Sequence, residues 1–377
     1  MSRESPLFER LPPTTRVERL TFPAISGWAG DDHAAALAAF RVSCAPLLDG
    51  KAALRDALPP SPGLLAACRT ALARFGSESV SSEAARAFFE AEFTAFDVKP
   101  ESGAGFLTAY YEPEVAASLT RTPAFPVPVL ARPADLVTIP QGGTLPGIPA
   151  NFAAARAKNG AYEIYPDRAA IWSGALAEQP LEIAWLRDEA ELFIIQVQGS
   201  ARLRLPDGRA TRLVYAGRNG HPYTSIGKIL VDRGDIPLAE MSLARLMGWL
   251  RADPARGRDL MEQNRSYVFF ARDDAAPMDQ GPIGGAGVPL TTGRSLAIDR
   301  SLWPYGLPIW ISTSPLTPQG PRAPLDRLMI AQDTGSAIVG PARGDFFMGS
   351  GDIAGAKAGL VRDAMRFIVL VPNGDLR

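Results

Sequence analysis

Three aspartates near the C-terminus form the densest group of residues able to do acid–base chemistry. They are Asp333, Asp345 and Asp352, and the residues between them are mostly small, which lets backbone approach a ligand closely. Aspartates in such a setting are also typical of turns and helix caps, so spacing alone assigns none of them. Asp345 is the strongest candidate, because it precedes Phe346 and Phe347 in what we expect to be a glycine-containing loop. Aromatic neighbours desolvate a carboxyl group, which raises its pKa towards values suited to a general acid.

Several other chemistries are disfavoured. The chain has two histidines and two cysteines, so zinc sites built from neighbouring Cys and His ligands cannot be assembled, and no metal is predicted. Residues 220–228 lack the glycine spacing of a phosphate-binding loop, and residues 281–290 lack the strand–helix frame of a dinucleotide fingerprint. Ser350 lies between glycines but not in the motif of a hydrolase nucleophile. A carboxylate is therefore the expected catalytic group.

The two cysteines, Cys44 and Cys68, lie 24 residues apart in an apolar region with helical character. Two buried thiols are one interpretation of this pattern. A disulfide is the other, and it would require an oxidising compartment. The spacing leaves both alternatives open.

Length and composition set the frame for these candidates. A chain of 377 residues predicts about two to three domains. Its 46% hydrophobic and 21% charged residues are typical of a globular protein, and a net charge of -1 argues against nucleic acid as a partner. No apolar stretch is long enough for a membrane span, and the first residues lack the apolar segment of a secretory signal. The expectation is a cytoplasmic chain or one whose leader has been removed.

The elements that must position the candidates change in character along the chain. Residues 31–96 show helical spacing with Asp or Ser in capping positions, which predicts three or four helices. Residues 101–115 alternate like a strand, and a hairpin turn is expected at 206–208. Further strands are expected within 125–130, 169–174, 181–187, 191–205, 210–217, 264–274, 309–313, 327–333, 336–340 and 367–372. Helices are expected at 241–253 and, beginning with Asp352 as its cap, at 353–365. The first and last parts could form one domain interrupted by a β-rich one.

Six ordered blocks of the sequence resemble the membrane-bound lytic murein transglycosylase A family, whose C-terminal part is called the 3D domain. The blocks are 108–113, 193–203, 215–227, 264–270, 287–299 and 333–355. Residues 1–100 match the family only in their general helical character. The resemblance implies a mainly β fold with N-terminal helices, in which a double-psi β-barrel domain is interrupted by an inserted second β-barrel domain. The implied domains are 1–111 with 264–377 and the insert 112–263, with a glycan lying in the groove between them.

The resemblance also implies roles for particular residues. It makes Asp345 the catalytic aspartate, while Asp352 takes a supporting position. Residues implied to bind substrate are Thr108, Tyr110, Tyr111, Gln198, Gly199, Ser200, Asp333 and Gly335. One of the two tyrosines is expected to stack on sugar and the other to fill the core. The implied extracytoplasmic site favours the disulfide between Cys44 and Cys68.

The implied activity is that of a peptidoglycan lytic exotransglycosylase, a carbon–oxygen lyase. Such an enzyme cleaves the β-1,4 bond between N-acetylmuramic acid and N-acetylglucosamine without water and leaves a 1,6-anhydro ring. One carboxyl group suffices, because it acts first as acid and then as base, and no cofactor is required. The implied partners are peptidoglycan glycan strands and other cell-wall enzymes, for a monomer in the periplasm with an outer-membrane anchor on its precursor. The alternatives are a hydrolytic glycosidase, in which Asp333 or Asp352 activates water, and an inactive glycan-binding protein.

Overall fold

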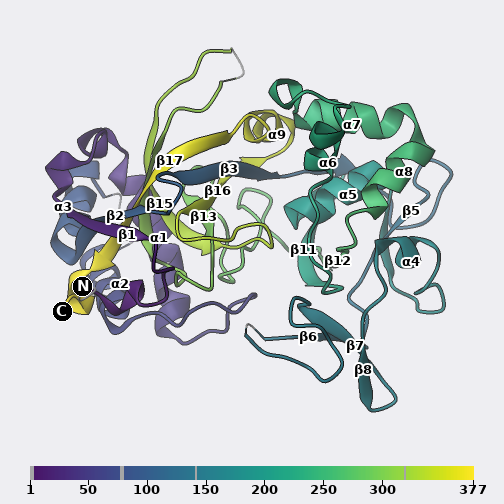
Figure 1. The fold of residues 1–377 in the computed structure, drawn as a ribbon, viewed down its shortest axis with the longest axis horizontal. Helices are drawn as coiled ribbons and strands as arrows, with labels where there is room; N and C mark the ends of the chain where they lie inside the picture. Colours follow the sequence, from purple (N-terminus) through teal and green to yellow (C-terminus); the bar gives the residue numbers. More distant parts are fainter. Residues whose placement is uncertain (1–3, 77–79, 141, 318–319) are drawn as a thin grey trace. The chain divides into compact units, whose positions relative to one another are not determined.

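The computed structural model describes residues 4–76, 80–140, 142–317 and 320–377 and divides into two compact units. The first unit comprises Met1–Tyr110, Ile283–Gly349 and Lys357–Arg377, and the second comprises Tyr111–Pro282 and Ser350–Ala356 (Figure 1). The domain boundary expected at 263/264 lies earlier than the boundary seen here. Residues 264–282 belong to the second unit because their strand β12 (Val268–Asp273) pairs with β11 (Ala210–Arg218).

Three helices near the N-terminus belong to the first unit, as the sequence predicts. They are α1 (His33–Leu48), α2 (Pro62–Arg74) and α3 (Ser82–Glu92). The side chains of Asp32, Ser61 and Ser81 each accept a hydrogen bond from a backbone N–H of the first turn. These caps satisfy donors that have no partner within the helix, which explains why each helix begins where it does.

The strands of the first unit form one sheet whose pairing closes on itself. The strands are β1 (Arg16–Leu20), β2 (Phe93–Lys99), β3 (Gly105–Glu112), β13 (Ser295–Ile298), β14 (Pro308–Thr313), β15 (Leu325–Asp333), β16 (Arg343–Ser350) and β17 (Arg362–Pro372). Their order is β1-β2-β17-β14-β15-β13-β16-β3, and β17 also pairs with β3. The strands from β17 through β3 therefore form a closed circuit of hydrogen bonds.

Both faces of several of these strands are buried. Ile309, Ile311, Phe367 and Val369 point into one apolar cluster, which lies on the inner side of the circuit. Trp310 and its outward-facing neighbours on β15 and β17 pack instead against the three helices. Burial on both faces explains the continuous apolar runs 308–311 of β14 and 367–372 of β17.

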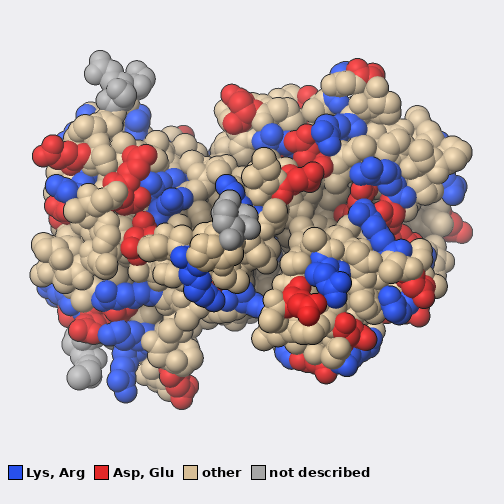
Figure 2. All heavy atoms as spheres, turned by 90° about the horizontal axis from the view of Figure 1, so that it is seen from above, with Lys and Arg blue, Asp and Glu red and all other residues tan. Residues whose placement is uncertain are grey.

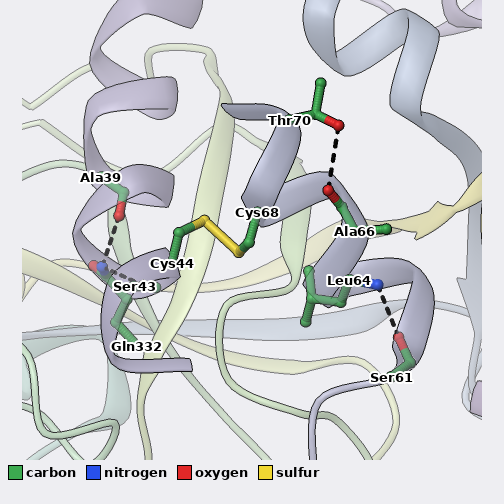
Figure 3. Close-up of a disulfide and its surroundings, with 9 residues drawn as sticks. All are labelled: Ala39, Ser43, Cys44, Ser61, Leu64, Ala66, Cys68, Thr70 and Gln332. Atoms are coloured by element: carbon green, nitrogen blue, oxygen red, sulfur yellow. Dashed lines mark hydrogen bonds between the residues drawn. A yellow bond between two sulfur atoms is a disulfide. The ribbon is translucent and has the colours of Figure 1, made fainter. Parts of the chain in front are cut away.

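A disulfide joins Cys44 of α1 to Cys68 of α2 (Figure 3). Both cysteines are fully buried within the cluster between the helices and the sheet. Of the two alternatives that the sequence left open, buried thiols or a disulfide, the structure has the disulfide. Near the disulfide, the side chain of Gln332 on β15 donates hydrogen bonds to the Ala39 carbonyl and the Ser43 hydroxyl of α1. These bonds tie α1 to the end of β15.

The second unit combines short strands with helices. Its strands are β4 (Glu114–Ala116), β5 (Val127–Leu130), β6 (Leu136–Thr138), β7 (Ala154–Lys158), β8 (Ala161–Glu163), β9 (Glu182–Leu186), β10 (Ala201–Arg204), β11 and β12. Its helices are α4 (Arg168–Trp172), α5 (Glu189–Gln198), α6 (Ile226–Arg233), α7 (Leu243–Ala252) and α8 (Pro254–Glu262), with most of α9 (Asp352–Ala358). The expected hairpin at 206–208 connects β10 to β11.

Three sheets are present in the described part of this unit. One has the order β12-β11-β10-β4, a second pairs β5 with β9, and a third has the order β6-β7-β8. Two isolated bridges, Ser118 with Trp185 and Ala131 with Phe270, connect the first sheet to the second at both of its edges. An apolar cluster of Val129, Leu203 and other residues from both sheets and from α5 lies among them.

Two segments expected to be strands are helical. Within 191–205, the residues up to Gln198 belong to α5, and Ala201–Arg204 forms β10. Every residue from Ala190 to Gln196 is buried, so the helix lacks the exposed face by which periodicity separates helix from strand. Within 169–174 the chain forms the short helix α4, capped by Asp167.

Two further expectations near the C-terminus are wrong. Residues 336–340 form a turn followed by irregular chain rather than a strand. The helix expected at 353–365 ends at Ala358, and the chain from Arg362 is already strand β17. Residues 362–365 pair with β3, so sheet hydrogen bonds replace the helical ones in this part of the expected helix.

Two features are absent from the described residues. None of their helices combines the length and apolar character needed to cross a membrane. No cluster of three or more His, Cys, Asp and Glu among them could hold a metal ion. Acidic and basic side chains are interspersed on the face seen in Figure 2, in keeping with the near-zero net charge.

Candidate active site

Two of the three aspartates lie on strands that flank β13. Ala297 of β13 pairs with Asp333 of β15 on one side and with Asp345 of β16 on the other. The register of β13 and β15 slips at this point, so that Gln332 is an extra residue between the paired positions. A bulge of this kind redirects the side chain that follows it. The sheet therefore brings Asp333 and Asp345 into one site, although 12 residues separate them in sequence.

Asp345 lies within strand β16 and not in the expected loop. Its neighbour Phe346 points into the inner apolar cluster, so the alternation of a strand directs Asp345 outwards. One carboxylate oxygen, Oδ1, accepts a hydrogen bond of 2.5 Å from the hydroxyl of Thr108 on β3, the next strand in the sheet.

The surroundings of Asp345 favour its protonated form. Desolvation is the largest effect and, with the nearby negative charge of Asp333, it raises the pKa of Asp345 to about 6. The cation of Arg343 and the hydrogen bond from Thr108 oppose this shift only in part. Near neutral pH the carboxyl group can therefore both give and take a proton, as acid–base catalysis requires.

Asp333 has a different environment, with three hydrogen-bond donors. Its Oδ1 accepts from the backbone N–H groups of Gly285, at 2.7 Å, and Thr334, at 2.8 Å. Its Oδ2 accepts from the hydroxyl of Tyr110, at 2.7 Å. Burial raises the pKa of Asp333, and these donors oppose the rise. The carboxylate is thus fixed in place, with both oxygens engaged.

Tyr110 is bonded to Asp333 and lies within the electrostatic influence of Asp345. It follows Thr108 by two residues on β3, so both side chains lie on the same face of the strand. Its ring contacts Phe347 with centroids 5.3 Å apart, and its hydroxyl donates to Asp333. Burial and the charges of Asp333 and Asp345 raise the pKa of Tyr110 well above its usual value, so the hydroxyl stays protonated and remains a donor.

Arg343 belongs to this site, although sequence reasoning missed it. Its Nη2 donates to the hydroxyl oxygen of Thr108 at 2.7 Å, and its guanidinium lies over the ring of Phe106, 5.2 Å from the centroid. The position two residues before Asp345 in a strand was the available signal, because residues at that spacing share a face. The expected loop at this point concealed it.

The remaining predicted residues are distributed over both units. Gly335 lies in the first unit, two residues after Asp333, whereas Tyr111, Gln198, Gly199, Ser200 and Asp352 lie in the second. Gly199 ends α5 in a left-handed conformation, with φ of 86°.

Tyr111 is anchored within the second unit. The side-chain carbonyl of Gln198 accepts the backbone N–H of Tyr111 at 3.1 Å, and burial followed by the charge of Asp352 raises the pKa of Tyr111 to about 12. The Tyr111 side chain is buried, so it fills the core of its unit.

Comparison with known proteins places this arrangement in a family. The model of the MltA specific insert domain matches residues 106–271, and that of the 3D domain matches residues 294–371. A crystal structure of the membrane-bound lytic murein transglycosylase from Agrobacterium tumefaciens is similar with a TM-score of 0.84 and 38% identity, covering 94% of this chain and 97% of that one. The chain belongs to the membrane-bound lytic murein transglycosylase A family.

Two other members of the family extend the comparison. Membrane-bound lytic murein transglycosylase A of Vibrio cholerae is 39% identical over 198 residues, which are 52% of each chain. The chain thus spans about half the length of this curated relative. A crystal structure of Escherichia coli MltA with bound chitohexaose has a TM-score of 0.68 and 28% identity, covering 94% of both chains. The matched insert domain begins on β3 and ends on β12, so it corresponds closely to the second unit.

Sequence reasoning also missed Glu112, a buried carboxylate outside the site of Asp333 and Asp345. Glu112, at the end of β3, is fully buried and accepts hydrogen bonds from the Nε atoms of Arg202, at 2.8 Å, and Arg212, at 2.7 Å. The hydroxyl of Ser350, at the end of β16, donates to it at 2.7 Å. All four residues belong to the second unit. The two cations compensate the buried charge of this carboxylate, as is typical of structural ion pairs.

Proposed function

We propose that this protein is a lytic transglycosylase that cleaves the β-1,4 bond between N-acetylmuramic acid and N-acetylglucosamine in peptidoglycan. Membership of the family supports the substrate class, as does the β-1,4-linked hexosamine oligomer, chitohexaose, bound to the Escherichia coli relative. The observation that carries the proposal is the environment of Asp345. One carboxyl group with a pKa near 6 lies in a site whose other carboxylate is fully engaged.

Asp345 acts as acid and then as base. In its protonated form it donates to the glycosidic oxygen as the bond from this oxygen to C1 of the muramic acid breaks. The resulting carboxylate takes the proton of the C6 hydroxyl while O6 bonds to C1, which forms the 1,6-anhydro ring. The nucleophile belongs to the substrate, so its effective concentration is high and no water is consumed.

The environment of Asp333 argues against the hydrolytic alternative. A hydrolase needs a second carboxylate that is free to activate water or attack C1. Both oxygens of Asp333 accept hydrogen bonds, and Asp352 is an exposed residue at the start of α9. Asp333 instead holds Tyr110 beside Asp345 and contributes the negative charge that favours protonation of Asp345.

The finer features of the family fold are part of the proposal. The closed strand circuit of the first unit supports a double-psi β-barrel. In the second unit, the two bridges that link its four-stranded sheet to its two-stranded sheet support an inserted second barrel. Gln198, Gly199 and Ser200 stay predictions as glycan-binding residues, as does Gly335. The family name supports action in the periplasm at a membrane surface, on peptidoglycan as the partner.

The test is mass spectrometry of purified peptidoglycan after digestion with the wild-type chain and with Asp345→Asn. We expect muropeptides ending in 1,6-anhydromuramic acid from the wild type alone. Reducing-end muramic acid would identify a hydrolase and require a second catalytic carboxylate. Glycan binding by the wild type without any product would identify a binding protein.

A further inference from the structure

The hydroxyl group of Thr108 lies between a cation and the carboxylate of Asp345. It receives a hydrogen bond from Nη2 of Arg343 at 2.7 Å and donates to Oδ1 of Asp345 at 2.5 Å. These are the side-chain partners of Thr108 among the described residues. Arg343 and Asp345 lie on β16 and Thr108 lies on the neighbouring strand β3, so the contacts cross between two strands of one sheet.

The guanidinium group determines the direction of the Thr108 proton. A threonine hydroxyl has one donor and two acceptor sites, whereas a guanidinium group only donates. Arg343 must therefore occupy an acceptor site of the Thr108 oxygen, and its positive charge repels the hydroxyl proton. That proton then points at Asp345, which is the acceptor beside it. Oδ1 of Asp345 is thereby the oxygen without a proton.

The other oxygen of Asp345 has different surroundings. Oδ2 accepts no hydrogen bond from any residue in the described part of the chain. Nor is it one of the fully buried side-chain atoms that lack a partner, so it is not sealed off from a ligand. A proton on this atom is therefore available to a ligand. The two oxygens of one carboxyl group thus have separate tasks.

We propose that Arg343 is a positioning residue that, through Thr108, places the catalytic proton of Asp345 on Oδ2. This inference rests on the proposed function, in which Asp345 is the general acid. In the first step the proton leaves Oδ2 for the glycosidic oxygen, and the electrons of the broken C1–O bond remain on that oxygen. In the second step Oδ2 takes the proton of the C6 hydroxyl as O6 bonds to C1, which restores the starting acid.

Arg343 is itself held in place by β3. Its guanidinium lies over the ring of Phe106, and its Nη1 donates to the carbonyl oxygens of Phe106 and Gly344. Gly344 faces inwards, where an added Cβ would lie 3.1 Å from Leu296 and 3.2 Å from Met365. The contacts of Arg343 with β3 and Gly344 hold the guanidinium in place beforehand, so it needs no reorganisation when substrate binds.

The test compares Arg343→Met, Thr108→Val and Thr108→Ser in kcat, KM and pH profile on the same glycan substrate. We expect Arg343→Met and Thr108→Val each to lower kcat about 10- to 100-fold, with KM changed less than about threefold. Thr108→Ser keeps the hydroxyl and should stay within about threefold of the wild type. Arg69→Met, which removes an exposed arginine from α2, is the matched control and should leave both constants unchanged.

The double variant Arg343→Met with Thr108→Val gives the decisive comparison. Because Arg343 acts through Thr108, the double variant should have the kcat of Thr108→Val alone within about threefold. Independent roles would multiply the two losses and overturn the inference, as would losses confined to KM, which would assign both residues to substrate binding.

The pH profile provides a readout that a merely structural role would not move. The charged or titratable groups facing Asp345 are Arg343, Asp333 and Tyr110. Removing the cation of Arg343 raises the pKa of Asp345 further, so the fall of kcat/KM at high pH should begin at a higher pH in Arg343→Met. An unmoved profile contradicts the inference. These outcomes differ from a failure of the proposed function, in which the wild type itself would release no anhydromuramic product.

Discussion

Strands β3 and β16 carry two carboxylate–hydroxyl pairs with opposite surroundings. In the first unit the Thr108 hydroxyl donates to Asp345, and in the second unit the Ser350 hydroxyl donates to Glu112. Glu112 also accepts hydrogen bonds from two guanidinium groups. The cation nearest to Asp345 along its hydrogen bonds is Arg343, which bonds to Thr108 and not to the carboxylate itself. The same pair of strands therefore holds one neutralised and one under-compensated carboxylate.

The difference separates a carboxylate compensated by cations from one with a raised pKa. A buried charge that is matched by adjacent cations and hydrogen bonds holds those partners in place, and its removal is costly to stability. A desolvated carboxyl with fewer compensating partners exchanges its proton near neutral pH, which makes it a candidate catalyst. Glu112 is fully buried and Asp345 partly so, and the number and charge of the donors differ between the two sites.

The largest expected effect is on activity at the under-compensated site. Asp345→Asn should lower kcat about 10³-fold or more, because the amide can neither donate an acidic proton nor take one back. Release of anhydromuramic products measures this, and thermal unfolding of the same variant checks that the fold is retained. Substantial residual turnover in a folded Asp345→Asn protein would remove Asp345 from the mechanism.

A large effect on stability is expected at the neutralised site. Glu112→Gln leaves the cations of Arg202 and Arg212 without their counter-charge, so the free energy of unfolding should fall by about 3 to 5 kcal/mol. Urea denaturation of the wild type and the variant measures the difference. A loss below about 1 kcal/mol would show that this carboxylate is not a structural element, and the comparison would fail.

The raised pKa of Asp345 predicts how both activity and stability depend on pH. The acid form is needed for the first step, so kcat/KM should fall about tenfold per pH unit above about 6. A carboxyl group whose pKa is higher in the folded than in the unfolded protein lowers the free energy of unfolding as the pH rises from about 4 to 6. Above about pH 6 this loss of stability stays constant. Asp345→Asn should therefore be more stable than the wild type at pH 8, by about 1 to 2 kcal/mol, and equal to it near pH 3.5. The opposite order of stabilities at pH 8 contradicts the assignment.

The smallest effect is expected at the third aspartate. Asp352 is exposed in the first turn of α9, where a negative charge interacts favourably with the helix N-terminus by roughly 0.3 to 1 kcal/mol. Asp352→Asn should change kcat by less than about threefold. A loss comparable to that of Asp345→Asn would revive the hydrolytic alternative, with Asp352 as its second carboxylate.

Part of the fold was predictable because its signals are local. The capped helices α1 and α3 and the hairpin between β10 and β11 follow from side chains adjacent in sequence. Helix α5 was missed because it is buried on nearly all sides, which removes the periodicity that identifies a helix. The end of α9 was missed because pairing of β17 with β3 determines where the helix stops, and β3 lies about 250 residues earlier in the chain.

The candidate site divides in the same way. Residue type, aromatic neighbours and family resemblance pointed to Asp345, and the resemblance pointed to Thr108, Tyr110 and Asp333. Arg343 could not be assigned a role, because its contact with Thr108 exists only once β16 lies beside β3. Glu112 was missed for the same reason, since its partners come from two other strands and from the end of β16.

By itself the sequence determined which groups are available for chemistry: a cluster of aspartates, few histidines and a pair of cysteines. Only the tertiary structure decided which of the carboxylates is poised to react. A pKa depends on desolvation and on charges within a few ångströms, and these are set by strands that are distant in sequence. Asp333, Asp345 and Glu112 are alike in chemical type. Asp345 has one donor and the other two have three each, of which two carry a charge at Glu112 and none does at Asp333.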